Sequence, residues 1–426
     1  MKADVPKISL QLYQKGVQFF SSKFARASAW MILSTLAAGT LAYFFQILMG
    51  RILSPNEYGL FSAMMGLFAI LAAPSSTLMM VISRKVSQYR AEHDAGSITH
   101  FYYWINIRTV IFGGLVFGVF LFFAPQIQLY MKAASIMQVY LIGFLVLITF
   151  MPIINNAFLQ GIQSFLWLSA SGSLWALLKI IFSFALVFIG FGVSGAIGGI
   201  ILSSLLISFI TYYALYQQLS VGRDKSYREQ HLTFKPVLPV LLANIAFTGI
   251  TQLDIVLVNY YFSAQDTGFY AAASILGKAV MYLSGSIAMA LFPMVAELHT
   301  RSESSLHLLL QAVGLTALLS GTGAIFYFMF GEAIIVLFFG EEYRTAGTIL
   351  KFYGFAALPM ALVMVVEHFL IAKGRVLFAY LFILILPLQL IAVYFYHSNL
   401  LMIVSIVGGS SLLVAILGFG LLFRAR

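Results

Sequence analysis

The chain has no cysteine and very little charge. Only 9% of its 426 residues are Asp, Glu, Lys or Arg, and 61% are hydrophobic. Soluble domains carry about 25% charged and about 45–50% apolar residues. The missing cysteines exclude disulfide frameworks, thiolate metal sites and cysteine nucleophiles. With a mean hydropathy of +0.97, most of the surface must face lipid rather than water.

Sequence signatures of catalysis are also missing. Gly277-Lys278 lacks the earlier glycine and the following Ser or Thr of a nucleotide-binding loop, and no H-E-x-x-H stretch exists. We therefore expect no metal and no cofactor. The longest loops, about 218–236 and 331–345, are too short for a separate domain of about 50 residues. The sequence favours a transporter over an enzyme. The alternatives outside transport are a membrane-embedded polysaccharide polymerase, which usually carries a large outer catalytic loop, and a structural assembly scaffold.

Long apolar windows follow one another along the chain, each near the roughly 20 residues that a helix needs to cross a bilayer. They predict an all-α polytopic membrane protein with about twelve transmembrane helices. The windows are 28–49, 58–81, 101–123, 136–157, 167–189, 196–217, 237–260, 268–292, 306–330, 346–371, 374–395 and 399–423.

Lysine and arginine placement predicts the orientation. With the N-terminus inside, 17 of the 24 basic residues fall in cytoplasmic segments, 3 in outer loops and 4 inside spans. By the positive-inside rule, this bias predicts that both termini lie on the cytoplasmic side of the membrane, which we expect to be the cell (inner) membrane. The net charge of +10 therefore records how the chain was inserted, and we expect no nucleic-acid partner.

The spans divide the chain into two halves. Residues 1–27 mix basic and apolar residues, which is typical of an amphipathic helix on the membrane surface. We expect an N-terminal six-helix lobe over 28–218, a cytoplasmic inter-lobe loop over 219–236 and a C-terminal six-helix lobe over 237–426.

A short internal repeat supports this division. LSPNEYGLFSA at 53–63 aligns with FSAQDTGFYAA at 262–272, so that Gly59 meets Gly268. Both copies lie between an odd span and the next even one, on the same side of the membrane. The repeat is therefore parallel. Two-fold repeats of this kind are common in secondary transporters, where the substrate path runs between the halves.

Six stretches carry a family resemblance. The sequence resembles the polysaccharide flippases of the multidrug/oligosaccharidyl-lipid/polysaccharide (MOP) superfamily, in order and over nearly the whole chain. The stretches are GRILSPNEYG (50–59), GVSGAIGG (192–199), Asp254 with TGFYAAA (267–273), FPMVAEL (292–298), FGEEYRTAGTIL (339–350) and AKGR (372–375).

The resemblance implies two six-helix bundles around a central, V-shaped cavity that opens alternately to each side. It also implies the cargo, an oligosaccharide repeat unit on undecaprenyl diphosphate, for surface polysaccharide biosynthesis and with polysaccharide polymerase machinery as a partner. Relatives with the same fold leave two alternatives open, a multidrug/cation antiporter and a lipid-linked peptidoglycan precursor flippase. Without a nucleotide motif, the driving force would be an H+ or Na+ gradient, the membrane potential or removal of the product.

Charged residues inside spans are the candidate site residues, because they usually face a bundle interior or an aqueous cavity. Lys179 and Lys278 lie near mid-membrane, and we expect them to hold the anionic head group unless they only make structural contacts. Arg108 is a third candidate, although its long side chain could instead snorkel to the interface. Asp254 and Glu367 are ion-coupling candidates; the alternative for each is a structural pairing, which for Glu367 would be an interfacial pair with Lys373.

Four prolines inside spans are hinge candidates: Pro74, Pro152, Pro359 and Pro387. Each removes an intrahelical hydrogen bond and permits a kink, which could serve alternating access or merely bend a helix.

Overall fold

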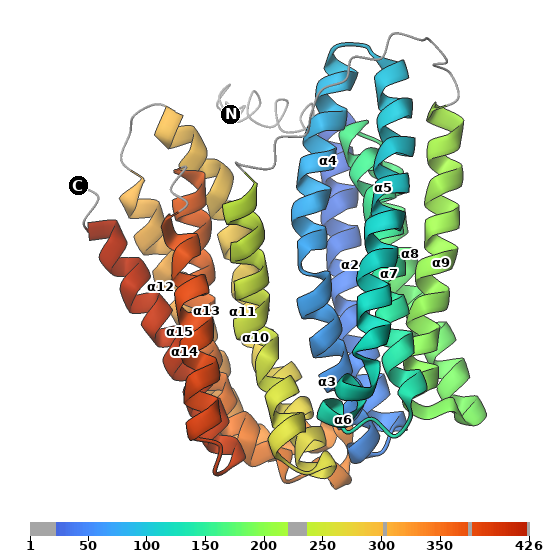
Figure 1. The fold of residues 1–426 in the computed structure, drawn as a ribbon. Helices are drawn as coiled ribbons and strands as arrows, with labels where there is room; N and C mark the ends of the chain where they lie inside the picture. The colour runs from blue at the N-terminus through green and yellow to red at the C-terminus, as the bar shows by residue number, and fades with distance from the viewer. Residues whose placement is uncertain (1–22, 220–236, 301–304, 374–376, 424–426) are drawn as a thin grey trace, which may run out of the picture.

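The computed structural model describes residues 23–219, 237–300, 305–373 and 377–423, and these residues fold as two helical bundles (Figure 1). Most of the expected N-terminal amphipathic segment and of the inter-lobe loop lies outside them. We call α2–α9 the N-lobe and α10–α15 the C-lobe. The N-lobe helices are α2 (Lys23–Ile52), α3 (Pro55–Ala72), α4 (Pro74–Ala91), α5 (Ala95–Phe122), α6 (Ala124–Met131), α7 (Ile136–Gly161), α8 (Phe165–Leu186) and α9 (Gly192–Leu219). The C-lobe helices are α10 (Leu238–Tyr261), α11 (Ala264–Thr300), α12 (Leu306–Phe339), α13 (Ala346–Ala372), α14 (Leu377–Phe395) and α15 (Leu400–Phe423).

Ten helical segments within the described residues are long and apolar enough to cross a membrane. One of them, 165–219, contains both α8 and α9, and α14 is a shorter apolar helix. Counted separately, these helices give the twelve expected spans. Large apolar side chains stand open on the outside, among them Phe112 at 70% and Phe188 at 82% exposed. The chain is a multi-pass membrane protein of the expected all-α class.

Local sequence explains where the helices turn. A π-helical turn (Val187–Phe191) connects α8 to α9, and Gly190 and Gly192 within and after it have φ of +102° and +49°. Residues with a side chain rarely adopt such values, so glycine permits the reversal. α8 and α9 then pack on each other along their length, and the hydroxyl of Ser183 donates to the Ala196 carbonyl oxygen at 2.9 Å.

The two copies of the internal repeat begin helices in the same way. Ser54 caps α3 and forms a capping box with Glu57. At the start of α11, the Ser263 hydroxyl accepts from the Asp266 amide at 3.1 Å and donates to its carboxylate at 2.7 Å. A small polar residue followed three positions later by an acid satisfies the amides that a helix start leaves open.

These two repeat copies also meet one another. α3 packs on both α10 and α11 and provides much of the contact between the lobes. A Cβ added to Gly59 would lie 2.6 Å from the Gly268 nitrogen and 2.8 Å from the Ala264 carbonyl oxygen. The backbones therefore touch at a distance that only glycine allows.

Aromatic and basic side chains add to this contact between the lobes. We call this end of the molecule, where the starts of α3 and α11 meet, the closed end. Tyr58 of α3 packs against Phe339 and Tyr343 of the C-lobe, with ring centroids 5.6 and 6.1 Å apart. The Arg51 Nε donates to the Phe338 carbonyl at 2.7 Å, and the Lys132 Nζ to the Phe262 carbonyl at 2.9 Å. Both carbonyls belong to helix C-termini, where the backbone leaves acceptors unpaired and cations bind favourably.

The lobes diverge away from the closed end. Figure 1 shows the two bundles close together at the bottom, and well separated at the top, where α9 ends and α10 begins. Beyond the closed end, the Asn244 Nδ2 of α10 donates a hydrogen bond to the Thr77 Oγ1 of α4 at 2.8 Å, across the two lobes. The ribbon thus has the V shape that the family resemblance implies.

Candidate functional site

Asp254 is the centre of a buried polar cluster in the C-lobe. Its carboxylate is fully buried in α10. The Oδ1 lies 3.3 Å from the Lys278 Nζ, and the Oδ2 accepts hydrogen bonds from the Tyr353 hydroxyl at 2.7 Å and the Tyr270 hydroxyl at 3.1 Å. The Ser274 hydroxyl donates to the Tyr353 oxygen at 3.1 Å. We call these five residues the Asp254 cluster.

Helical spacing explains how α11 supplies three members of the cluster. Tyr270, Ser274 and Lys278 are four residues apart, so they share one face of the helix. Tyr353 comes from α13, which packs closely on α11. The cluster therefore joins α10, α11 and α13. Sequence reasoning named Asp254 and Lys278 but missed the two tyrosines and the serine, although the four-residue spacing was a readable signal.

Charge in this cluster is balanced. A buried carboxylate is stable only when it is paired and hydrogen-bonded. Here one ammonium pairs with it and two hydroxyl groups donate hydrogen bonds to it. The residues expected to bind an anion and to couple an ion thus form a single ion pair, with Lys278 only 7% exposed. In this state neither charge is available to a large ligand.

A small cavity borders the pair. It has a volume of about 20 Å³, and Thr251, Lys278, Tyr353 and Ser411 contribute its polar side chains. A cavity needs about 10–15 Å³ to hold one water molecule. The space therefore fits about one water, and is far too small for a diphosphate.

Lys179 has different surroundings in the N-lobe. Its side chain is 8% exposed on α8, and its Nζ lies 4.4 Å from the Phe45 ring centre and 4.7 Å from that of Trp175. Ring faces attract cations, and the Trp175 Nε1 is held by the Ser204 hydroxyl at 3.2 Å. Among the described residues, no carboxylate pairs with Lys179. Its charge is covered by two rings but not neutralised.

The two remaining charged candidates lie apart from both lysines. Arg108 is exposed on α5, with its guanidinium carbon 3.9 Å from the Trp104 ring centre one turn earlier. Glu367 is half-buried on α13, and within the described ranges its carboxylate makes no hydrogen bond or ion pair. Lys373, four positions after Phe369, contacts that ring at 4.7 Å. The structure does not bring Arg108 or Glu367 into either buried site.

The candidate hinges differ in how they affect their helices. Pro74 begins α4 directly after Ala73, so it separates α3 from α4 within one span. Pro152, Pro359 and Pro387 lie inside α7, α13 and α14, which continue through them. Pro74 thus stands at the one break between helices among these four positions.

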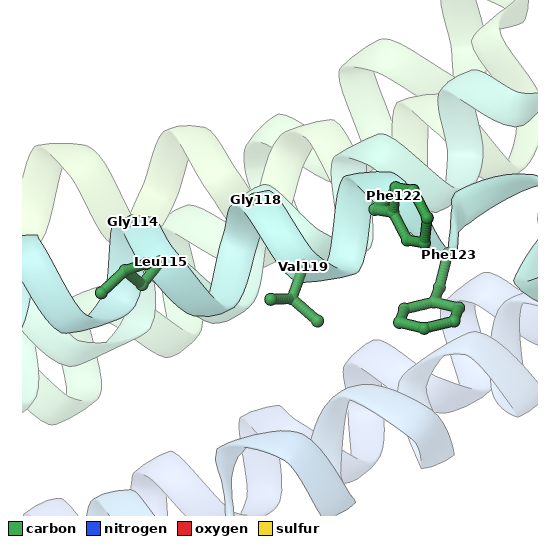
Figure 2. A pocket seen from close by; sticks show the side chains of 6 residues that line it. All are labelled: Gly114, Leu115, Gly118, Val119, Phe122 and Phe123. Atoms are coloured by element: carbon green, nitrogen blue, oxygen red, sulfur yellow. The ribbon is translucent and has the colours of Figure 1, made fainter.

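Another pocket is apolar and lies along α5 and at its C-terminal end. Figure 2 shows Leu115 and Val119 along this helix and Phe122 and Phe123 at its end. With Gly114 and Gly118 they line a space of about 580 Å³ that contains no charged side chain. It offers nothing to a phosphate or a sugar. Across the described residues, no group of three His, Cys, Asp or Glu could hold a metal ion.

Comparison with known proteins identifies the family of this chain and structures with a similar fold. Residues 48–348 match the family described as "Polysaccharide biosynthesis protein". No protein with a curated function shows significant sequence similarity to the chain. Among solved structures, the inward-facing conformation of a multidrug resistance MATE family transporter of the MOP superfamily has a TM-score of 0.74 at 16% identity, over 89% of this chain and 92% of that one.

Two further structures extend the comparison. The inward closed conformation of the lipid II flippase MurJ has a TM-score of 0.72 at 13% identity, over 93% of this chain and 87% of that one. An outward-facing MATE transporter has a TM-score of 0.61 at 17% identity, over 95% and 96%. All three structures share the fold of this chain at low sequence identity. The chain belongs to the polysaccharide biosynthesis protein family and has the fold of MOP superfamily transporters.

Proposed function

We propose that the protein is a secondary transporter that flips undecaprenyl-diphosphate-linked oligosaccharide repeat units across the cytoplasmic membrane. The family and the fold support transport or flipping of a lipid-linked precursor. The positive-inside bias supports placing the closed end, with the short loops at residues 53–54 and 262–263, on the outer side. The V would then open to the cytoplasm, where such repeat units are assembled.

The observation that carries the choice of cargo is the unneutralised charge of Lys179. Asp254 is cancelled by Lys278, so the net charge buried at these two sites is positive. An unneutralised ammonium in a site of low dielectric attracts an anion strongly, and a diphosphate is an anion. A carrier of cationic drugs would need the opposite, an unpaired carboxylate at these sites, and Glu367, whose carboxylate has no partner within the described ranges, lies in neither of them.

The path to Lys179 must open before a head group can reach it. Phe45 of α2 and Trp175 of α8 cover the ammonium in this state. We propose that the diphosphate displaces one of these rings and takes its place beside the Nζ, while the polyprenyl tail remains in lipid. Arg108 and Glu367 are outside this path, and we assign them no contact with the cargo.

Deletion of the gene tests the function directly. Completed repeat units on their lipid carrier should accumulate on the cytoplasmic face, and the wild-type chain should clear them. An unchanged lipid-linked pool with an unchanged surface glycan would refute the proposal. Increased sensitivity to cationic drugs, without such accumulation, would favour an antiporter, and accumulation of exported but unpolymerised units would favour a polymerase.

The Lys179 assignment needs its own variants in the deletion strain. Lys179→Ala should leave the repeat units accumulated at a normal protein level, and Lys179→Arg should restore part of the export. The matched control is Lys351→Ala, because Lys351 is also a lysine within a span but is paired with Glu332 at 2.8 Å. Normal export by Lys179→Ala would show that the head group binds elsewhere.

A further inference from the structure

Arg108 is a cation with unused hydrogen-bond donors on the outside of the N-lobe. Its side chain is exposed, and its guanidinium carbon lies 3.9 Å from the Trp104 ring centre. Within the part of the chain that the structure describes, neither this guanidinium group nor the Trp104 indole N–H makes a hydrogen bond or an ion pair. The helices that pack most closely on α5 are α4, α6, α7 and α9, all of the same lobe. Five guanidinium donors and one indole donor are therefore left open.

The direction of the Arg108 side chain suits a lipid phosphate. Side chains on a helix lean towards its N-terminus, and the contact with Trp104, one turn earlier, shows that the guanidinium group does so. The positive-inside prediction places the start of α5 on the cytoplasmic side. A cation that reaches from the hydrocarbon to this interface meets lipid phosphates there. Arginine binds a phosphate through two parallel hydrogen bonds, so the open donors match this ligand.

An apolar groove continues along the same face of α5. Five side chains share this face, because they are spaced by four, seven, four and three residues: Trp104, Arg108, Leu115, Val119 and Phe122. The last three line the space of about 580 Å³ that Figure 2 shows, and all three are exposed. Gly114 and Gly118 leave the groove open, since a Cβ added to either would meet no atom within 4 Å. The groove thus has room for hydrocarbon.

The length of this face selects the occupant. Arg108 and Phe122 are fourteen residues apart, which is about 21 Å along a helix. One leaflet supplies only about 15 Å of hydrocarbon, half of a core of about 30 Å. The acyl chains of a phospholipid with its phosphate at Arg108 would therefore end partway along the groove. A polyprenyl chain is long enough to cross the middle of the bilayer and fill it.

We propose that this face of α5 binds a bare polyprenyl phosphate, the carrier lipid without its sugar. The Arg108 guanidinium group and the Trp104 indole N–H hold the phosphate, and the polyprenyl chain lies in the apolar groove. Because no polar side chain lines the groove, it gives a sugar nothing to bind. The site is separate from Lys179, so the carrier is kept beside the transporter without blocking the proposed cargo path. The inference rests on the proposed function for the identity of the carrier, undecaprenyl phosphate.

Native mass spectrometry of the full chain in detergent with added undecaprenyl phosphate tests the phosphate contact. The wild-type chain should retain a lipid molecule that Lys179→Met also retains, which separates this site from the proposed cargo site. Arg108→Gln should weaken the binding about tenfold or more, because hydrogen bonds to a charged group are among the stronger ones. Binding of undecaprenol, the same chain without phosphate, should not change in this variant. The matched control is Arg344→Gln, which removes an exposed arginine that is paired with Glu341 and should bind like the wild type.

The dependence on chain length tests the groove. Gly118→Leu fills the groove without a clash, because nothing lies within 4 Å of an added Cβ. It should weaken the binding of undecaprenyl phosphate about fivefold or more, through lost apolar contact. It should not affect geranyl phosphate, which is too short to reach from Arg108 to this position, whereas Arg108→Gln should weaken both. Gly409→Leu is the matched control, because Gly409 is also exposed and has nothing within 4 Å.

Three results would overturn the inference. The first is loss of the retained lipid in Lys179→Met, because the phosphate would then be held at the cargo site. The second is equal binding of phosphatidylglycerol with the same dependence on Arg108 and Gly118, which would make this a phospholipid site. The third is wild-type binding by both Arg108→Gln and Gly118→Leu. These measurements need no transport, so the inference and the proposed function can fail separately.

Discussion

Two buried lysines, one in each lobe, have opposite surroundings. Lys278 in the C-lobe has a carboxylate and sits among hydroxyl groups, whereas Lys179 in the N-lobe has only the faces of Phe45 and Trp175. Both are about equally buried, at 7% and 8% exposed. Depth in the membrane therefore does not decide what a charge does. The neighbouring side chains differ: Lys278 forms an ion pair between α10 and α11, whereas no carboxylate among the described residues neutralises Lys179.

Breaking the C-lobe pair should have the largest effect on stability. Lys278→Met leaves Asp254 buried without a counter-charge, and we expect a loss of about 3–5 kcal/mol, seen as a much lower melting temperature in detergent. Adding Asp254→Asn should restore most of the loss, because the neutral amide still accepts hydrogen bonds from Tyr270 and Tyr353. If the double variant is as unstable as the single one, the pair is not the unit that matters.

The same change in the N-lobe should have little effect on stability or raise it slightly. Lys179→Met removes a charge that has no counter-charge and keeps the contacts with both rings, so we expect melting at or above the wild-type temperature. Export of repeat units should nevertheless fall at least about tenfold, equivalent to about 1.4 kcal/mol. A marked drop in melting temperature would mean that Lys179 is structural and that the comparison fails.

Contact between the lobes should respond to added bulk. Gly59→Ala places a methyl group 2.6 Å from the Gly268 nitrogen, and overpacking of this kind costs about 1–3 kcal/mol. The cost falls on the closed end, so the contact between the lobes there should be populated less and the opposite ends of the lobes should approach each other. Spin labels at Gln88→Cys on α4 and His307→Cys on α12, near those opposite ends, should therefore report a shorter mean distance between the labels than in the chain with Gly59. Gly114→Ala is the control, because nothing lies within 4 Å of that glycine. A shift in the control but not in Gly59→Ala would contradict this reading of the contact.

A surface ion pair should matter least. The Arg344 guanidinium lies 2.7 Å from the Glu341 carboxylate and lowers the pKa of that carboxyl group below its ordinary value. A lowered folded-state pKa means that the contribution is present above the unfolded pKa and is lost as pH falls through the folded one. Because both groups are exposed and screened by water, Glu341→Gln should leave the melting temperature unchanged at neutral and acidic pH. A clear change would show that this loop contributes to the contact between the lobes at the closed end.

Much of the fold could be predicted because hydrophobic length and repeat position are local properties of a sequence. The twelve spans and the all-α class are confirmed, and so is the resemblance to MOP superfamily transporters. The pairing of Asp254 with Lys278 could not be read in the same way, because it depends on which faces of α10 and α11 turn towards each other. The spacing of Tyr270, Ser274 and Lys278 marked one face, but not its partner.

The roles of the individual residues were less predictable than the spans. Lys179 and Lys278 look alike in the sequence, as single lysines near mid-membrane, and only the neighbouring helices distinguish them. Pro74 resembles the other three span prolines until the structure shows a helix ending beside it. The cargo and coupling roles of Lys179, Lys278, Arg108, Asp254 and Glu367 remain predictions, and the variants above test Lys179 for its role and Lys278 with Asp254 for their pairing.

The meeting of the two repeat copies has a consequence for how such a chain could have arisen. A face that contacts its own duplicate across a two-fold axis has the geometry of an isologous dimer interface, in which each patch is complementary to itself. Gly59 and Gly268 touch in this way near the starts of α3 and α11, and these two helices begin with the same kind of cap. A single ancestral half with this face would fit a second copy of itself, and after gene fusion each half could diverge. The sequence shows such divergence, because the alignment that pairs Gly59 with Gly268 pairs Ala69 with Lys278.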